Sequence, residues 1–113
     1  MRSLAAVVAL LAAGCEPGWR VQGHVRDPDT GALHGAGVAL HCPGQQDLAA
    51  TTDREGEFQL IGRGPGPSLD CTVVVASPAY APVRVPLSIA CGDADGAERS
   101  CAVASVDAQL RRR

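Results

Sequence analysis

The chain has 113 residues and a formal net charge of −2, with ten basic residues against twelve acidic ones. A chain of this size suits one small domain, and the lack of a basic face argues against nucleic-acid binding. The only dense basic run is Arg111–Arg113. We expect it to be a frayed, solvated terminus; contact with anionic lipid head groups is the alternative.

The first fifteen residues have the features of an export signal. Met1–Ser3 supplies a positive charge, and residues 4–13 are an uncharged run of Leu, Ala and Val. A membrane span takes about 20 apolar residues, so this run suits a signal peptide instead. The segment LAAGC, ending at Cys15, resembles a bacterial lipobox, although Ala12 stands where Leu is usual. The resemblance implies cleavage before Cys15 and lipid on its sulfur. The alternative is an ordinary signal peptide that leaves Cys15 as a thiol or disulfide partner.

These features divide the chain into four parts. We expect residues 1–14 to be a cleaved lipoprotein signal peptide and residues 15–18 a lipidated cysteine with a short tether. Residues 19–110 form the folded domain, and residues 111–113 an Arg-rich tail. The protein is then exported and anchored by its lipid to a bacterial membrane. Glu16 is not the Asp that marks inner-membrane retention in enteric bacteria, which favours the outer membrane.

The four remaining cysteines are an even set in an exported chain, which predicts two disulfides. No Cys-x-x-Cys pair is present, so zinc-ribbon and redox motifs have no support. Four cysteines allow three pairings, and the sequence alone leaves all three open. We favour Cys42–Cys71, because each lies at the end of a predicted strand, and Cys91–Cys101, because the two bracket a short loop.

The rest of the chain is predicted to be all-β. Apolar and polar residues alternate in short segments separated by turn formers. Residues 48–61 are typical of a hairpin with its turn at Gly56. Residues 71–77 are nearly all apolar and predict a central strand buried on both faces, and Pro86 favours an edge strand. The pattern predicts a seven-stranded antiparallel β-sandwich, with strands at 19–27, 38–42, 48–53, 57–61, 71–77, 83–89 and 102–110.

The segments VQGHVRDPDTGALHGAGVAL and TTDREGEFQL resemble the carboxypeptidase regulatory-like domain over residues 20–87. The order and spacing of the matching residues are more specific than any single one. The resemblance implies a transthyretin-like (prealbumin-like) sandwich that carries no active site and aids folding, interaction or surface binding. The four cysteines depart from the family pattern. The matching positions are Val21, Gly23, Val25, Thr30, Gly31, Gly35, Ala36, Val38, Leu40, Thr52, Asp53, Gly56, Phe58 and Leu60.

Three histidines are the candidate metal ligands. His24 and His41 fall on the polar faces of their predicted strands, and His34 lies in a turn. His24 and His41 would meet only if their strands were neighbours, and no carboxylate is placed with them by a recognised spacing. We therefore expect surface histidines, no metal site and no cofactor.

Calcium and glycan sites have weaker signals. The turns DPDTG, from Asp27, and GDADG, with Asp93, lack the later oxygen ligands of an EF-hand, so we expect plain turns. Trp19 and Tyr80 are the aromatic residues left for a glycan platform, because Phe58 belongs to the predicted core.

Catalysis is not expected from the sequence. The chain ends in QLRRR and lacks the Tyr-Arg-Gly-Ser ending of the related hydroxyisourate hydrolases, and it has no Gly-x-Ser-x-Gly motif. The sequence thus predicts a non-catalytic, membrane-anchored lipoprotein whose sandwich is an interaction module for a protein partner in the cell envelope. A carbohydrate- or calcium-binding module at the cell surface is the alternative.

Overall fold

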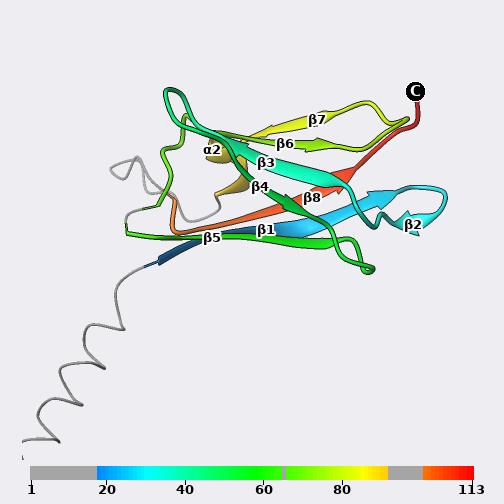
Figure 1. The fold of residues 1–113 in the computed structure, drawn as a ribbon, viewed down its shortest axis with the longest axis horizontal. Helices are drawn as coiled ribbons and strands as arrows, with labels where there is room; N and C mark the ends of the chain where they lie inside the picture. The colour runs from blue at the N-terminus through cyan, green and yellow to red at the C-terminus, as the bar shows by residue number, and fades with distance from the viewer. Residues whose placement is uncertain (1–17, 65, 92–100) are drawn as a thin grey trace, which may run out of the picture.

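Alternating apolar residues build two four-stranded sheets that pack face to face (Figure 1). The computed structural model describes residues 18–64, 66–91 and 101–113. In the first sheet, the long strand β1 (Gly18–Asp27) lies between β8 (Val103–Gln109) on one side and β5 (Glu57–Arg63) with β2 (Gly31–Ala32) on the other. The predicted all-β sandwich is confirmed.

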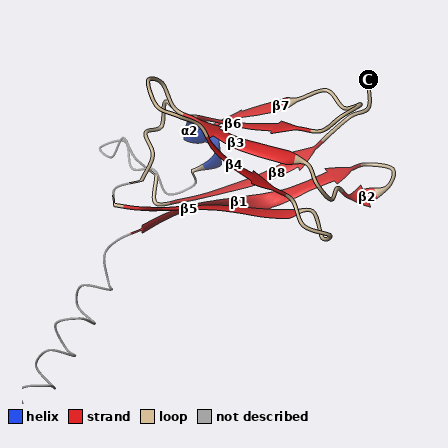
Figure 2. Cartoon of the chain, viewed as in Figure 1, coloured by secondary structure: helices blue, strands red, loops and turns tan. Residues whose placement is uncertain are grey.

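The second sheet is antiparallel throughout, in the order β4-β3-β6-β7. Strand β6 is central and β7 lies at an edge, both as predicted. Its strands are β3 (Gly37–His41), β4 (Leu48–Thr51), β6 (Thr72–Ala76) and β7 (Val83–Pro86). Figure 2 shows strands in both layers, with the short helix α2 (Leu87–Ala90) beside them at one end. Within the described residues, no helix is long and apolar enough to cross a membrane.

The predicted hairpin over residues 48–61 is wrong. Strand β4 pairs with β3 in the second sheet, whereas β5 pairs with β1 in the first. Between them the chain changes sheets through a turn in which Gly56 has a φ of 74°, a conformation that glycine adopts without strain. The Asp53 carboxylate accepts hydrogen bonds from the backbone N–H groups of Glu55 and Glu57, at 3.0 and 2.9 Å. A tight turn was predictable here, but which strands it joins depends on pairing with distant strands.

Three further details differ from the predicted strands. Strand β8 runs parallel to β1, because β7 brings the chain back to the end where β1 begins and β8 starts from that same end (Figure 1). The predicted strand 83–89 ends at Pro86, which has no N–H to extend the ladder, and α2 follows it. Strand β2 is an additional two-residue strand inside a predicted turn.

The core lies between the sheets and is filled by the inward positions of each strand. Gly23 allows β8 to approach β1 closely, because a Cβ atom at this position would overlap the Val106 carbonyl. Strand β6 is fully buried on its inner face only, because Val74 on the outer face is half-buried. The prediction that both faces of this strand are buried is therefore wrong. The most completely buried large side chains are Val21, Val25, Val38, Val73, Val75, Leu87 and Leu110.

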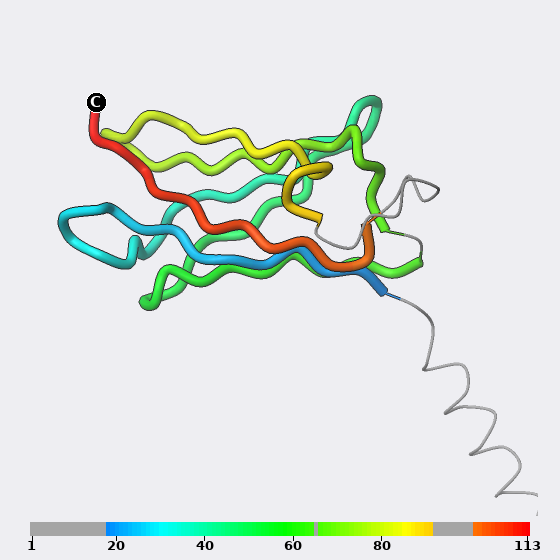
Figure 3. Tube along the Cα trace, turned by 180° about the vertical axis from the view of Figure 1, so that it is seen from behind, coloured from blue at the N-terminus to red at the C-terminus, as the bar shows by residue number. Residues whose placement is uncertain are grey.

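The sandwich has two distinct ends, and both views of the chain show them (Figures 1 and 3). The near end is the one where β1 begins at Gly18, with α2 and the connection between β3 and β4. The far end is the one where β1 finishes at Asp27, with β2 and the C-terminus. Each end holds a different set of the residues singled out from the sequence.

Candidate functional site

The outer surface of the first sheet carries a row of charged side chains across three strands. His24 of β1 lies opposite Glu57 of β5 on one side and opposite Asp107 of β8 on the other. The neighbouring row holds Gln59 of β5, Gln22 of β1 and Ser105 of β8. We call these six residues the polar face. They point outward because Phe58, Leu60 and the inward residues of β8 occupy the alternate positions.

His24 is held between two carboxylates. Its Nε2 lies 3.0 Å from Oε1 of Glu57, and its Nδ1 lies 3.5 Å from Oδ1 of Asp107. All three side chains are more than half exposed, so the pairs contribute little to stability. Their main effect is to orient polar groups toward solvent.

A shallow, open depression of about 620 Å³ covers the polar face. Thr51 and Asp53 complete its rim at the edge next to β4. The lining offers amide, hydroxyl, carboxylate and imidazole groups, which suits a polar partner that donates and accepts hydrogen bonds. Among the described residues, no group of three His, Cys, Asp or Glu side chains is arranged to hold a metal ion.

His24 and His41 do not meet, because β1 and β3 belong to different sheets. Nδ1 of His41 lies 2.8 Å from Oδ1 of Asp47, in an exposed pair at the near end. His34 is exposed in the turn between β2 and β3. The two-histidine arrangement that a metal site would require is therefore not formed.

A buried carboxylate organises the far end. Asp27 is 2% exposed, and its Oδ2 accepts hydrogen bonds from the Tyr80 hydroxyl at 2.6 Å and from Nε of Arg112 at 3.2 Å. Its Oδ1 accepts from the backbone N–H of Asp29 at 2.7 Å. These bonds, that from Tyr80 above all, outweigh burial and lower the pKa of Asp27 from 3.8 to about 2. Because these donors converge on its two oxygens, Asp27 acts as a structural group that holds the far end together.

The C-terminal backbone is hydrogen-bonded rather than frayed, so the predicted frayed terminus is wrong, whereas all three arginines are exposed to solvent as predicted. The Arg111 carbonyl accepts a hydrogen bond from the N–H of Ala81 at 2.9 Å, and the Arg113 N–H donates to the Ala79 carbonyl at 3.0 Å. The Arg112 guanidinium also lies 5.8 Å from the centre of the Tyr80 ring. The run was expected to be frayed because its sequence is charged, but Asp27 supplies a buried partner for Arg112 from a distant part of the chain.

The aromatic residues do not form a platform. Trp19 is 9% exposed and packs against Gly62 in the near end, whereas Tyr80 is bound to Asp27 in the far end. Phe58 is buried, as expected for a core residue. Aromatic stacking of a sugar on Trp19 and Tyr80 together is therefore excluded by their positions.

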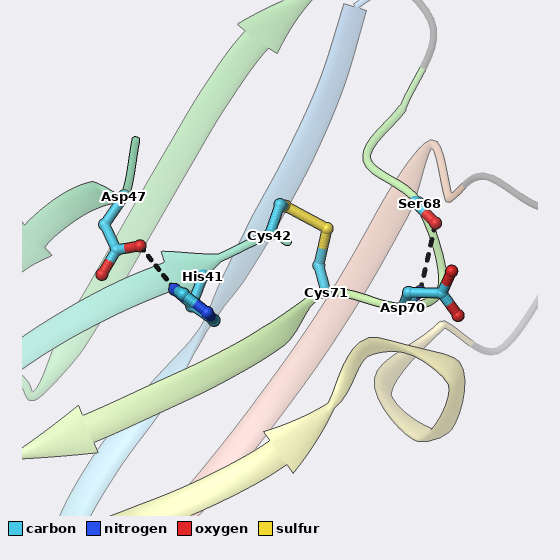
Figure 4. Close-up of a disulfide and its surroundings, with 6 residues drawn as sticks. All are labelled: His41, Cys42, Asp47, Ser68, Asp70 and Cys71. Atoms are coloured by element: carbon cyan, nitrogen blue, oxygen red, sulfur yellow. Dashed lines mark hydrogen bonds and ion pairs between the residues drawn. A yellow bond between two sulfur atoms is a disulfide. The ribbon is translucent and has the colours of Figure 1, made fainter. Parts of the chain in front are cut away.

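Both disulfides lie at the near end, with the pairing favoured from the sequence. Cys42 at the end of β3 joins Cys71 before β6 (Figure 4), and Cys91 after α2 joins Cys101 before β8. The proposed lipid site Cys15 and the turn with Asp93 lie outside the described residues.

No protein-family model matches the chain, and no curated protein matches it in sequence. Its fold is similar to that of several solved structures. One is 3-chlorocatechol 1,2-dioxygenase from Rhodococcus opacus, with a TM-score of 0.58 and 11% identity over 87% of this chain and 61% of that one. Another is hydroxyquinol 1,2-dioxygenase from Pseudomonas putida, with a TM-score of 0.57 and 12% identity over 87% of this chain and 57% of that one.

A third similar structure is the pilus 2b backbone protein of group B streptococcus, with a TM-score of 0.52 and 15% identity over 83% of this chain and 41% of that one. The chain thus spans less than two thirds of the length of each of these proteins. At such low identities the similarity establishes the sandwich fold alone.

The prediction that the chain is not an enzyme is contradicted by these comparisons. It depended on a resemblance to domains that carry no active site, whereas several solved structures with a similar sandwich are dioxygenases. A sandwich of this kind is therefore a fold on which enzymes are also built, and the fold supplies no argument against catalysis.

The sequence analysis did not identify the two partners of His24 on the polar face. Glu57 and Asp107 were not connected with His24, although the inward positions of Phe58 and Leu60 already directed Glu57 outward. The missing information was strand order, because β5 and β8 lie on opposite sides of β1.

Proposed function

We propose that the protein is an exported lipoprotein, anchored by lipid on Cys15, whose sandwich is an interaction module of the carboxypeptidase regulatory-like type in the bacterial cell envelope. The observation that carries this proposal is the sequence order: a signal-like segment ends in LAAGC, and the first strand that the structure describes begins at Gly18. Two disulfides suit an oxidising compartment. The pilus backbone protein with this fold supports a role in protein–protein contacts.

The anchor is tested with the variant Cys15→Ser in the native bacterium. We expect wild-type protein in the membrane fraction with a diacylated residue at its mature N-terminus, as measured by mass spectrometry. Cys15→Ser is expected in the soluble fraction, because it lacks the sulfur that carries the lipid. Glu16→Gln is the matched control and is expected to stay with the membrane. A membrane-bound Cys15→Ser variant, or wild-type protein without lipid on residue 15, would falsify the anchor.

The polar face is the surface that we assign to the partner, because it gathers polar and charged side chains in one open depression. A photo-reactive amino acid in place of Gln22 or Gln59 is expected to cross-link a single envelope protein in living cells. The control position is Arg84, which is exposed on β7 in the other sheet. Equal cross-linking from Arg84 would show that the partner does not use the polar face.

A further inference from the structure

The outer surface of the first sheet changes in character along β1. Around the middle of the strand it carries the polar face, with the carboxylates of Glu57 and Asp107. At the near end it carries two exposed apolar side chains, Ile61 and Val103, which are 65% and 51% exposed. Isolated apolar residues on a surface need no explanation, but these two occur together and beside arginines.

Strand register brings these residues into one row. Arg20 of β1 lies opposite Ile61 on β5 and opposite Val103 on β8, so the two apolar side chains flank the Arg20 stem on the same side of the sheet. Arg63 follows Ile61 at the next outward position of β5 and lies opposite Gly18. We call Arg20, Ile61, Arg63 and Val103 the near-end patch. It combines apolar side chains with two positive charges.

The near-end patch lies close to the proposed lipid. Three residue steps separate Cys15 from Gly18, which span at most about 11 Å when fully extended. Arg20 is two residues farther along β1, about 7 Å in a strand. The patch therefore stays within about 20 Å of the lipid-bearing residue in any orientation of the domain.

We propose that the near-end patch rests on the surface of an anionic bilayer. Ile61 and Val103 enter the boundary between head groups and acyl chains, where apolar side chains leave water. Arg20 and Arg63 contact lipid phosphates, which attract basic residues close to an anionic surface. This inference rests on the proposed anchor at Cys15 and specifies which side of the domain the anchor presses against the membrane.

The charges on the other sides of the near end favour this orientation over its alternatives. Asp47 and Asp70 are exposed beside the second sheet, so a contact through that side would bring carboxylates toward anionic lipid. Glu57 and Asp107 lie about 14 Å beyond Arg20 along the sheet, away from the anchor. The Arg111–Arg113 run lies at the far end (Figure 3) and is directed away from the anchored end, so it does not supply the contact.

The test uses the full lipoprotein in vesicles of phosphatidylcholine with phosphatidylglycerol. A diazirine-bearing amino acid replaces Ile61, Val103 or Ile89. Ile89 is the matched control, because it is 74% exposed on α2, outside the near-end patch. After illumination, mass spectrometry measures lipid adducts at each position. We expect at least about fivefold more lipid adducts at Ile61 and Val103 than at Ile89, because only the patch enters the interface.

A second pair of measurements tests the contribution of the positive charges of Arg20 and Arg63. The double variant Arg20→Gln with Arg63→Gln is expected to lower the yield at Ile61 in anionic vesicles and to leave it unchanged in pure phosphatidylcholine. Equal adducts at Ile61 and Ile89 in protein that floats with the vesicles overturn the docking surface but leave the anchor intact. Adducts to another protein chain instead of lipid also overturn it. Protein that does not float with the vesicles overturns the anchor and the docking surface together.

Discussion

The two ends of the sandwich are stabilised by different chemistry. The near end holds both disulfides, Cys42–Cys71 and Cys91–Cys101. The far end, as far as the structure describes it, has no covalent cross-link and is organised by the buried carboxylate of Asp27. Stability at the near end is therefore sensitive to reductants, whereas stability at the far end is sensitive to acid.

The lengths of the connections at the two ends account for part of this difference. The far end contains connections of at most six residues. The buried Thr52 hydroxyl links two of them, donating to the Leu33 carbonyl and accepting from the Ala36 N–H. The near end receives the longest connections, 64–71 between β5 and β6 and 91–102 between α2 and β8. Longer closed loops gain more from a cross-link, because the unfolded chain loses more freedom.

The largest expected effect comes from removing the disulfides. Replacing Cys42 and Cys71 together by Ala is expected to lower the free energy of unfolding by about 4 kcal/mol, and replacing Cys91 and Cys101 by about 3 kcal/mol. The difference follows from sequence separations of 29 and 10 residues. Urea unfolding of both double variants measures the two values. A greater loss for the Cys91 and Cys101 variant would contradict the loop-length argument.

A smaller loss is expected from Asp27→Asn at the far end. The neutral amide no longer provides a charged acceptor for Tyr80 and Arg112, so the melting temperature at pH 7 is expected to fall. The folded pKa of Asp27, about 2, lies below its unfolded value of 3.8. The stabilisation is therefore complete above the unfolded value and is lost as pH falls through 3.8 toward 2.

Melting curves between pH 2 and pH 7 measure this dependence. Wild type and Asp27→Asn are expected to converge in stability at the acid end of that range, because protonated Asp27 is also neutral. A constant difference between the two proteins across the range would mean that the Asp27 charge does not stabilise the far end.

The smallest effect is expected from the same substitution at the near end. Asp47 pairs with His41 at 2.8 Å, but both side chains are at least half exposed, and exposed pairs contribute little. Asp47→Asn is expected to change the free energy of unfolding by less than about 0.5 kcal/mol. Urea unfolding of Asp47→Asn and of Asp27→Asn measures the two losses of free energy of unfolding. An equal loss of free energy of unfolding in both variants would contradict the expectation that the buried carboxylate stabilises the fold more than the exposed one.

The strands themselves were predictable because side-chain alternation is a local property. Val21 and Val25 in β1, and Val38 and Leu40 in β3, are buried as their spacing indicates. Strand partners were less predictable. The turn at Gly56 suits a hairpin and a change of sheet equally well, and only the second occurs. The polar face was missed for the same reason, since Glu57, His24 and Asp107 become neighbours only through strand order.

The sequence by itself determined the all-β class, most turn positions and most of the buried positions of the strands. These depend on residues that are close in the chain, where periodicity and turn chemistry act directly. Tertiary structure alone decided the parallel placement of β8, the burial of Asp27 beneath Tyr80 and Arg112, and the grouping of Arg20 with Ile61 and Val103. Each of these joins segments that are distant in sequence, and only the packing of the two sheets brings them within contact distance.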